Sequence, residues 1–132
     1  MGLNKIHHFL IDNLNTAVLL LDEGLKILQE VREKINVPVV SDFSIPSWAK
    51  PTAEVVDLIQ VPAYLCRQTS ILQAAAETKR PILLKKGQFM SPWNMANSVK
   101  KIEAAGGTQV LLADRGTFFG YNMLVNDMRC LP

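Results

Sequence analysis

Apolar positions recur along this chain with two different periods, one typical of helices and one typical of buried strands. Apolar residues spaced three and four apart over residues 21–35 predict an amphipathic helix that ends near Asn36. A second helix is predicted to begin after Thr69, which would act as its N-cap. A third is predicted at Ser91-Pro92, with serine as the cap and proline at the first helical position.

Short apolar runs between these helices predict four strands. The runs lie in Val37–Val40, Val55–Val61, Ile82–Leu84 and Gln109–Ala113, and a short helix or turn is expected at Pro46–Ala49. A continuous apolar run is expected of a strand that is buried on both faces of a parallel sheet. Strand alternates with helix about four times, and connections of this length require parallel strands. The predicted class is therefore α/β, either a barrel or a doubly wound sheet.

A polar residue lies at the carboxyl end of each predicted strand. These residues are Asp42, Gln60, Lys85 and Arg115. In an α/β sheet such ends converge on one mouth, where ligands bind. Arg115 suits a planar, bidentate partner and Lys85 acts as a point charge, so the set predicts a small ligand with phosphate and carboxylate groups. The alternative is that the four strand ends are solvated independently of one another, with Lys85 and Lys86 pointing into water.

Composition excludes several other classes of protein. The 132 residues suggest one domain, and a net charge of +2 without a basic stripe does not favour nucleic acid as a partner. The apolar run over residues 16–21 is too short to cross a membrane and makes a poor signal peptide, so a cytoplasmic protein is expected. Cys66 and Cys130 match no metal spacing and are expected to be free thiols. No glycine-rich phosphate loop is present, although Asp42 and Asp114 could act as general bases.

Three longer blocks carry a specific family resemblance. They are DLIQVPAYLCRQT at residues 57–69, KKGQF at 85–89 and DRGTFFGYN at 114–122. In this order and spacing they resemble the 3-deoxy-D-manno-octulosonate 8-phosphate synthase family, and the similarity extends from about Asp22 to Pro132. The resemblance implies a partial TIM (β/α)8 barrel of about four consecutive units over residues 21–132. Residues 1–20 are left as a leader of unclear structure.

The resemblance also implies an activity and a set of site residues. The family condenses phosphoenolpyruvate with D-arabinose 5-phosphate to give 3-deoxy-D-manno-octulosonate 8-phosphate and phosphate, in lipopolysaccharide biosynthesis. Lys85 and Arg115 match residues that hold phosphoenolpyruvate, and Gln60 and the backbone of Ala63 would lie against the same ligand. Asp42 matches an aspartate of the active-site floor, so Lys85, Arg115 and Asp42 are the candidate catalytic residues.

Partners and cofactors follow from the resemblance in the same way. Tyr64 and Arg67 match a block near a subunit contact, which implies a homo-oligomer or association with other barrel pieces. A divalent metal is possible in the family, but its ligand positions are not found in this chain. Because the resemblance covers about half a barrel, the chain is expected to be a fragment or truncated form with negligible activity alone. The alternative is a non-catalytic half-barrel that binds phosphoenolpyruvate-like anions or docks with an intact synthase protomer.

Overall fold

The computed structural model describes residues 21–118 and 122–131, so the expected leader over residues 1–20 lies outside the described residues. The chain divides into two compact units, Met1–Val37 and Pro38–Pro132. In the first unit, residues 21–35 are helical, as their apolar spacing predicted. Asn36 follows with a φ of 56°, a left-handed conformation in which helices commonly end.

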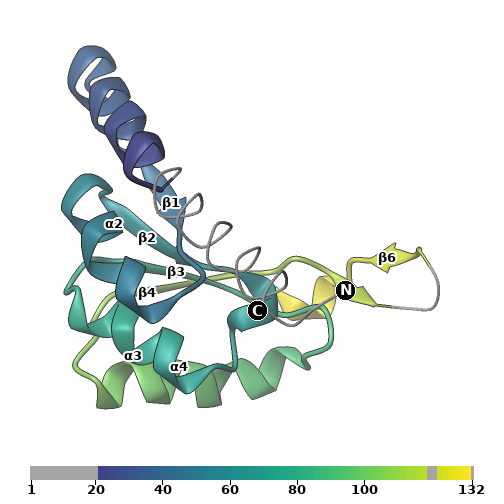
Figure 1. The fold of residues 1–132 in the computed structure, drawn as a ribbon. Coiled ribbons are helices and arrows are strands. Elements are labelled where there is room, and N and C mark those ends of the chain that lie inside the picture. The colour runs from purple at the N-terminus through teal and green to yellow at the C-terminus, as the bar shows by residue number, and fades with distance from the viewer. Residues whose placement is uncertain (1–20, 119–121, 132) are drawn as a thin grey trace, which may run out of the picture. The chain divides into compact units, whose positions relative to one another are not determined.

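The second unit contains one four-stranded parallel sheet. Its strands are β1 (Val40–Asp42), β2 (Leu58–Val61), β3 (Ile82–Lys85) and β4 (Val110–Ala113), and they lie side by side in chain order (Figure 1). In a doubly wound sheet the order in which strands are added reverses at a switch point, whereas in a (β/α)8 barrel each new strand is added on the same side. The order therefore confirms the α/β class and matches four consecutive units of such a barrel.

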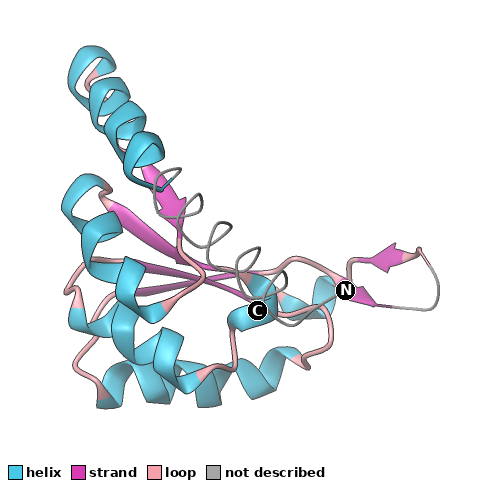
Figure 2. Cartoon of the chain, viewed as in Figure 1, coloured by secondary structure: helices cyan, strands magenta, loops and turns pink. Residues whose placement is uncertain are grey.

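Three helices connect these strands and form one layer. They are α2 (Ala49–Val55), α3 (Thr69–Glu77) and α4 (Met95–Ala104), and the alternation of strand and helix is clear in Figure 2. Helix α3 contacts both α2 and α4, and α2 and α3 contact β2. The three helices consequently cover the same face of the sheet, as right-handed crossovers require.

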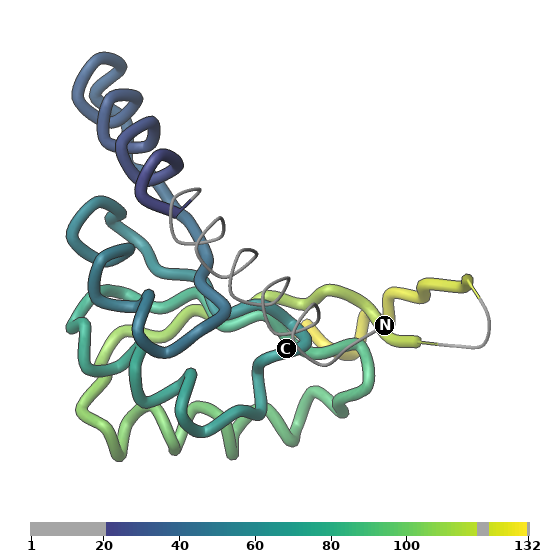
Figure 3. Tube along the Cα trace, in the orientation of Figure 1, coloured from purple at the N-terminus to yellow at the C-terminus, as the bar shows by residue number. Residues whose placement is uncertain are grey.

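The unit also contains several shorter elements, and Figure 3 shows the course of the Cα trace through the chain. Single 3-10 turns lie at η1 (Pro46–Trp48), η2 (Ala63–Leu65), η3 (Pro92–Asn94) and η4 (Met128–Cys130). Two short strands, β5 (Thr117–Phe118) and β6 (Leu124–Val125), pair in antiparallel orientation. The turns η2 and η3 lie between a strand and the following helix, on the side of the sheet where the strands end.

The core lies between the sheet and its helix layer. Alternate strand residues are fully buried there, together with the apolar faces of the helices: Ile59, Val61, Ile82, Leu84, Ile71, Leu72, Ala75, Ala76 and Ile102. Each large aliphatic side chain of this group stabilises the fold by roughly 1.5–3 kcal/mol through burial. On the opposite face Leu58 and Leu83 are only half-buried, and Leu111 is 55% exposed. The prediction of strands buried on both faces is thus wrong for the described residues, because the helices cover one face only.

Several predicted element bounds are also wrong. Strand β1 begins at Val40, which is exposed, rather than at Val37. Helix α2 occupies Ala49–Val55, so β2 begins only at Leu58. Thr69 is the first residue of α3, and Gln68 holds the cap position without a side-chain bond. Ser91 does lie at the predicted cap position, but its side chain makes no capping bond and the first turn is 3-10.

Candidate active site

The carboxyl ends of neighbouring strands bring three of the predicted site residues onto one sheet face. Asp42 is paired in register with Gln60, and Gln60 with Leu83, two residues before Lys85. Because side chains alternate along a strand, Asp42, Gln60 and Lys85 share the face that the helices leave uncovered. Gln60 Nε2 donates a hydrogen bond to Asp42 Oδ2 at 3.4 Å.

Arg115 follows the end of the neighbouring strand. Lys85 is paired in register with Ala113, so Arg115 lies just beyond β4 on the same end of the sheet as Lys85. Arg115 is exposed and Lys85 is half-buried. In the part of the chain that the structure describes, neither side chain forms an ion pair or a hydrogen bond. Both positive charges are therefore free to meet an anion.

Ala63 reaches this end of the sheet through a close approach of two loops. It begins η2 after β2 and is 6% exposed. A Cβ placed on Gly87, in the loop after β3, would lie 3.0 Å from Ala63 O and 2.7 Å from Phe89 Cζ. Only glycine fits this position without displacing a neighbour. The loop after β2 thus packs directly against the loop that follows Lys85.

Three exposed aromatic side chains form a cluster on these loops. The ring centroid of Tyr64 lies 6.4 Å from that of Phe89 and 6.2 Å from that of Phe118. Arg67 lines a nearby cavity of about 290 Å³ together with Phe89 and Lys101. The proposed subunit contact through Tyr64 and Arg67 stays a prediction. Sequence reasoning missed Phe89 and Phe118, which could have been recognised as aromatic residues placed just after strand ends.

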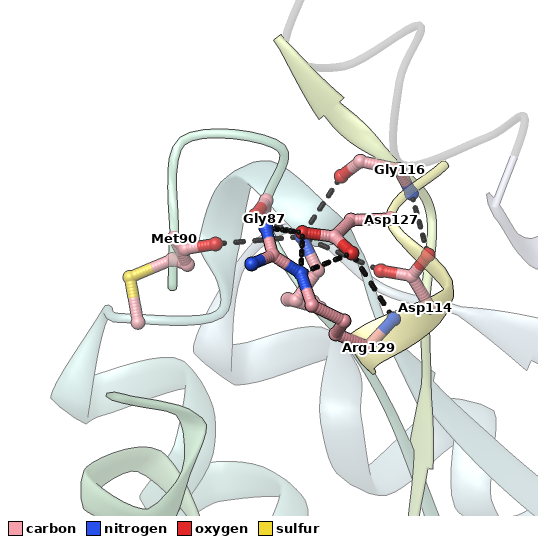
Figure 4. Close-up of polar contacts among 7 residues, drawn as sticks. Gly87, Met90, Asp114, Gly116, Asp127 and Arg129 are labelled. Atoms are coloured by element: carbon pink, nitrogen blue, oxygen red, sulfur yellow. Dashed lines mark hydrogen bonds and ion pairs between the residues drawn. The ribbon is translucent and has the colours of Figure 1, made fainter. Parts of the chain in front are cut away.

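Lys86 does not point into water, so the alternative interpretation, in which both lysines are solvated, is wrong for this residue. Its side chain is buried, and its Nζ lies 3.4 Å from Asp114 Oδ1 and 2.8 Å from Gly116 O. Figure 4 labels these two partners and draws their contacts as dashed lines. Asp114 is therefore paired with a lysine, whereas the sequence alone makes it a candidate general base. The alternation of strand side chains carried the signal, since adjacent residues Lys85 and Lys86 point to opposite faces.

Other features of the described residues lie away from this site. A cavity of about 690 Å³ lies between α2 and α3 and is lined by none of the predicted site residues. Among the described residues, no group of three His, Cys, Asp or Glu side chains could hold a metal ion. No helix in the described part of the chain is long and apolar enough to span a membrane.

Comparison with known proteins gives the family context. Residues 19–132 match the model of the DAHP synthetase I family. The chain is 55% identical over 112 residues to a 2-dehydro-3-deoxyphosphooctonate aldolase from Cyanothece sp. (strain PCC 7425 / ATCC 29141). The matched region is 85% of this chain and 41% of that protein. Proteins of the same name from Geobacter sulfurreducens and Desulfotalea psychrophila are 51% and 53% identical over 112 residues, again 85% of this chain, and 41% and 40% of those relatives.

The chain thus spans about 41% of the length of these relatives. The family match nevertheless covers the whole described sheet, its helix layer and every predicted site residue. The parallel strand order and the polar strand ends agree with that match. The chain belongs to the DAHP synthetase I family.

Proposed function

We propose that this chain carries the phosphoenolpyruvate-binding part of a 3-deoxy-D-manno-octulosonate 8-phosphate synthase. Relatives named 2-dehydro-3-deoxyphosphooctonate aldolase, about half identical in sequence, support this function. The observation that carries it is the placement of Lys85 and Arg115, two cations without ion-pair partners in the described chain, beside Gln60 at adjacent strand ends.

In the proposed reaction, the methylene carbon of phosphoenolpyruvate forms a bond to the aldehyde carbon of D-arabinose 5-phosphate. Water adds to the neighbouring carbon of phosphoenolpyruvate, and the C–O bond to phosphate breaks as phosphate leaves. Lys85 and Arg115 would hold the carboxylate and phosphate groups, with the Gln60 amide and the Ala63 backbone against the same ligand. Cations preorganised at such a site stabilise negative charge that develops in the transition state.

Asp42 has a supporting role in this proposal. Its carboxylate accepts the hydrogen bond from Gln60 Nε2 and so orients the amide on the uncovered face. Loss of this carboxylate would free the amide to rotate without removing a charge that binds the ligand. Asp42 therefore affects the reaction through the placement of Gln60, in addition to any direct contact with the sugar phosphate.

Titration calorimetry with phosphoenolpyruvate tests the proposed site. Lys85→Ala and Arg115→Ala should each weaken binding roughly tenfold to a hundredfold, since a hydrogen bond to a charged group contributes about 1.5–3 kcal/mol. Lys100→Ala is a matched control, because Lys100 is an exposed lysine of α4 and not part of the site. Unchanged affinity in both site variants would reject the site.

Turnover of the chain is a separate question. We expect the 132-residue chain by itself to show negligible phosphate release with both substrates, because four barrel units supply only part of a barrel mouth. Phosphate release at the rate of a full-length synthase would contradict this expectation.

A cytoplasmic location and free thiols at Cys66 and Cys130 belong to the same proposal.

A second candidate is a non-catalytic module that docks with an intact synthase protomer. The exposed Tyr64, Phe89 and Phe118 cluster, with Arg67 beside it, favours this alternative or a homo-oligomer. Size-exclusion chromatography of the chain, alone and mixed with a full-length synthase, separates these possibilities. A monomer that does not comigrate with the synthase would count against both forms of association.

A further inference from the structure

Lys86 is a buried lysine that the proposed reaction does not use. It is 4% exposed, and its backbone N–H continues the β3–β4 ladder by donating to Ala113 O at 2.8 Å. A buried ammonium group is costly unless it is paired and hydrogen-bonded. The surroundings of its Nζ atom therefore show what this side chain contributes to the fold.

Every donor of this ammonium group has an acceptor. Nζ donates to Gly116 O at 2.8 Å, Gly87 O at 3.3 Å and Met90 O at 3.4 Å. Its charge lies 3.4 Å from Asp114 Oδ1. A lysine has three N–H donors, so three carbonyls and one carboxylate satisfy it completely. Lys86 thus has no donor left for a ligand, and it binds the loop after β3 to the turn after β4 (Figure 4).

The two residues that Lys86 holds on the β4 side flank Arg115. Asp114 pairs with the ammonium group and Gly116 accepts its shortest hydrogen bond. Asp114 Oδ2 also accepts a hydrogen bond from the Gly116 N–H at 3.2 Å, which closes the turn around Arg115. Gly116 adopts a φ of 78°, a left-handed conformation that a side chain would strain.

We propose that Lys86 is a positioning residue that fixes the backbone of Arg115 relative to Lys85. Lys85 is the last residue of β3 and Lys86 follows it, so one cation faces the uncovered side of the sheet and the next holds the turn that contains Arg115. This role rests on the proposed binding of an anion by Lys85 and Arg115. Without the ammonium group, the Asp114–Gly116 turn keeps only the backbone hydrogen bonds on either side of it, from Lys86 N–H to Ala113 O and from Phe118 N–H to Gln88 O. Arg115 must then be ordered at the expense of ligand affinity.

A double-mutant cycle separates positioning from general destabilisation. Lys86→Met keeps an unbranched side chain and removes the charge. Calorimetric titration with phosphoenolpyruvate should show about a tenfold loss of affinity for Lys86→Met in the otherwise unchanged chain, and less than about twofold in an Arg115→Ala background. An equal loss in both backgrounds would overturn the proposal, because the effect would then not pass through Arg115.

Asp114→Asn provides a second variant should Lys86→Met fail to fold. It preserves the volume of the side chain and leaves the three carbonyl acceptors of Lys86 in place. Its smaller loss of affinity should likewise vanish in the Arg115→Ala background. Lys86→Arg should restore part of the affinity that Lys86→Met loses, since charge is regained while the fit is imperfect.

Amide hydrogen exchange gives a readout that needs no ligand. The amides of Arg115 and Gly116 should exchange faster in Lys86→Met than in the unchanged chain, while amides of α3 should not. Unchanged exchange at these two amides would overturn the positioning role. If Lys85→Ala and Arg115→Ala leave phosphoenolpyruvate binding unaltered but exchange does accelerate, the proposed function fails and the structural tie to Arg115 stands.

Discussion

Asp127 and Arg129 form a local ion pair at the start of η4. Arg129 Nη2 lies 2.6 Å from Asp127 Oδ2, and the Arg129 N–H donates to Asp127 Oδ1 at 3.0 Å. The side-chain hydrogen bond from Arg129, followed by its backbone hydrogen bond, lowers the pKa of Asp127 from 3.8 to about 2. The carboxylate thus both caps the turn and pairs with its arginine.

We predict that nuclear magnetic resonance will find the Asp127 carboxyl titrating with a pKa of about 2. Arg129→Gln should raise this pKa toward 3.8, incompletely, because the backbone N–H still donates. A pKa that is lower in the folded chain contributes stability above pH 3.8, and that stability is lost as pH falls through about 2. The pair is exposed, so its effect on overall stability is small. An Asp127 pKa unchanged by Arg129→Gln would contradict the assignment.

At the scale of single elements, β3 shows how one strand divides its residues between core and site. Ile82 and Leu84 are fully buried against the helix layer, whereas Leu83 and Lys85 face the uncovered side. Lys86, the first residue after the strand, is buried again. Strand β4 has no such division, since Leu111 and Leu112 are both more than half exposed.

Paired truncations of strand leucines test this division. Leu84→Ala should lower the free energy of unfolding by about 2–5 kcal/mol, because it opens a cavity in a packed core. Leu111→Ala, the matched control on the neighbouring strand, should change it by no more than about 0.5 kcal/mol. Urea unfolding followed by circular dichroism measures both. A comparable cost at the two positions would show that the face of Leu111 is covered in solution.

At the scale of the whole Pro38–Pro132 unit, one face of the parallel sheet is covered and the other is not. Both outer strands present apolar side chains, with Val40 48% and Leu111 55% exposed. Strand edges with unpaired backbone groups and exposed apolar residues are prone to associate. The described unit therefore carries a tendency to associate that its own helix layer does not remove.

We predict that the chain associates in a concentration-dependent manner through these strands. Val40→Lys with Leu111→Lys should shift sedimentation velocity profiles toward the monomer, because edge lysines oppose strand pairing. Ile27→Lys is a control, since Ile27 is 62% exposed but belongs to the Met1–Val37 unit. A monomer at all concentrations, or an equal response to Ile27→Lys, would contradict the prediction.

Much of the fold was predictable because helix and strand periods are local properties of the chain. The spacing of apolar residues located the helix over residues 21–35, and short apolar runs located β2, β3 and β4 to within a few residues. A short helix or turn was predicted at Pro46–Ala49, but its continuation as α2 to Val55 was missed because Ala49–Val55 carries a proline and only a weak apolar stripe. The cap at Thr69 was misplaced because capping depends on backbone angles that residue type alone does not set.

The sequence by itself determined the parallel α/β alternation, the family and which residues lie at strand ends, because all of these follow from local pattern and order. Only the tertiary structure decided that Lys85 faces the uncovered side while Lys86 is buried against Asp114 and Gly116. It also decided that β2 and β3 are buried on one face only. The alternation of side chains indicates only that the two lysines face opposite sides. Which of them is buried, and with which partners, depends on the distant segments that meet there.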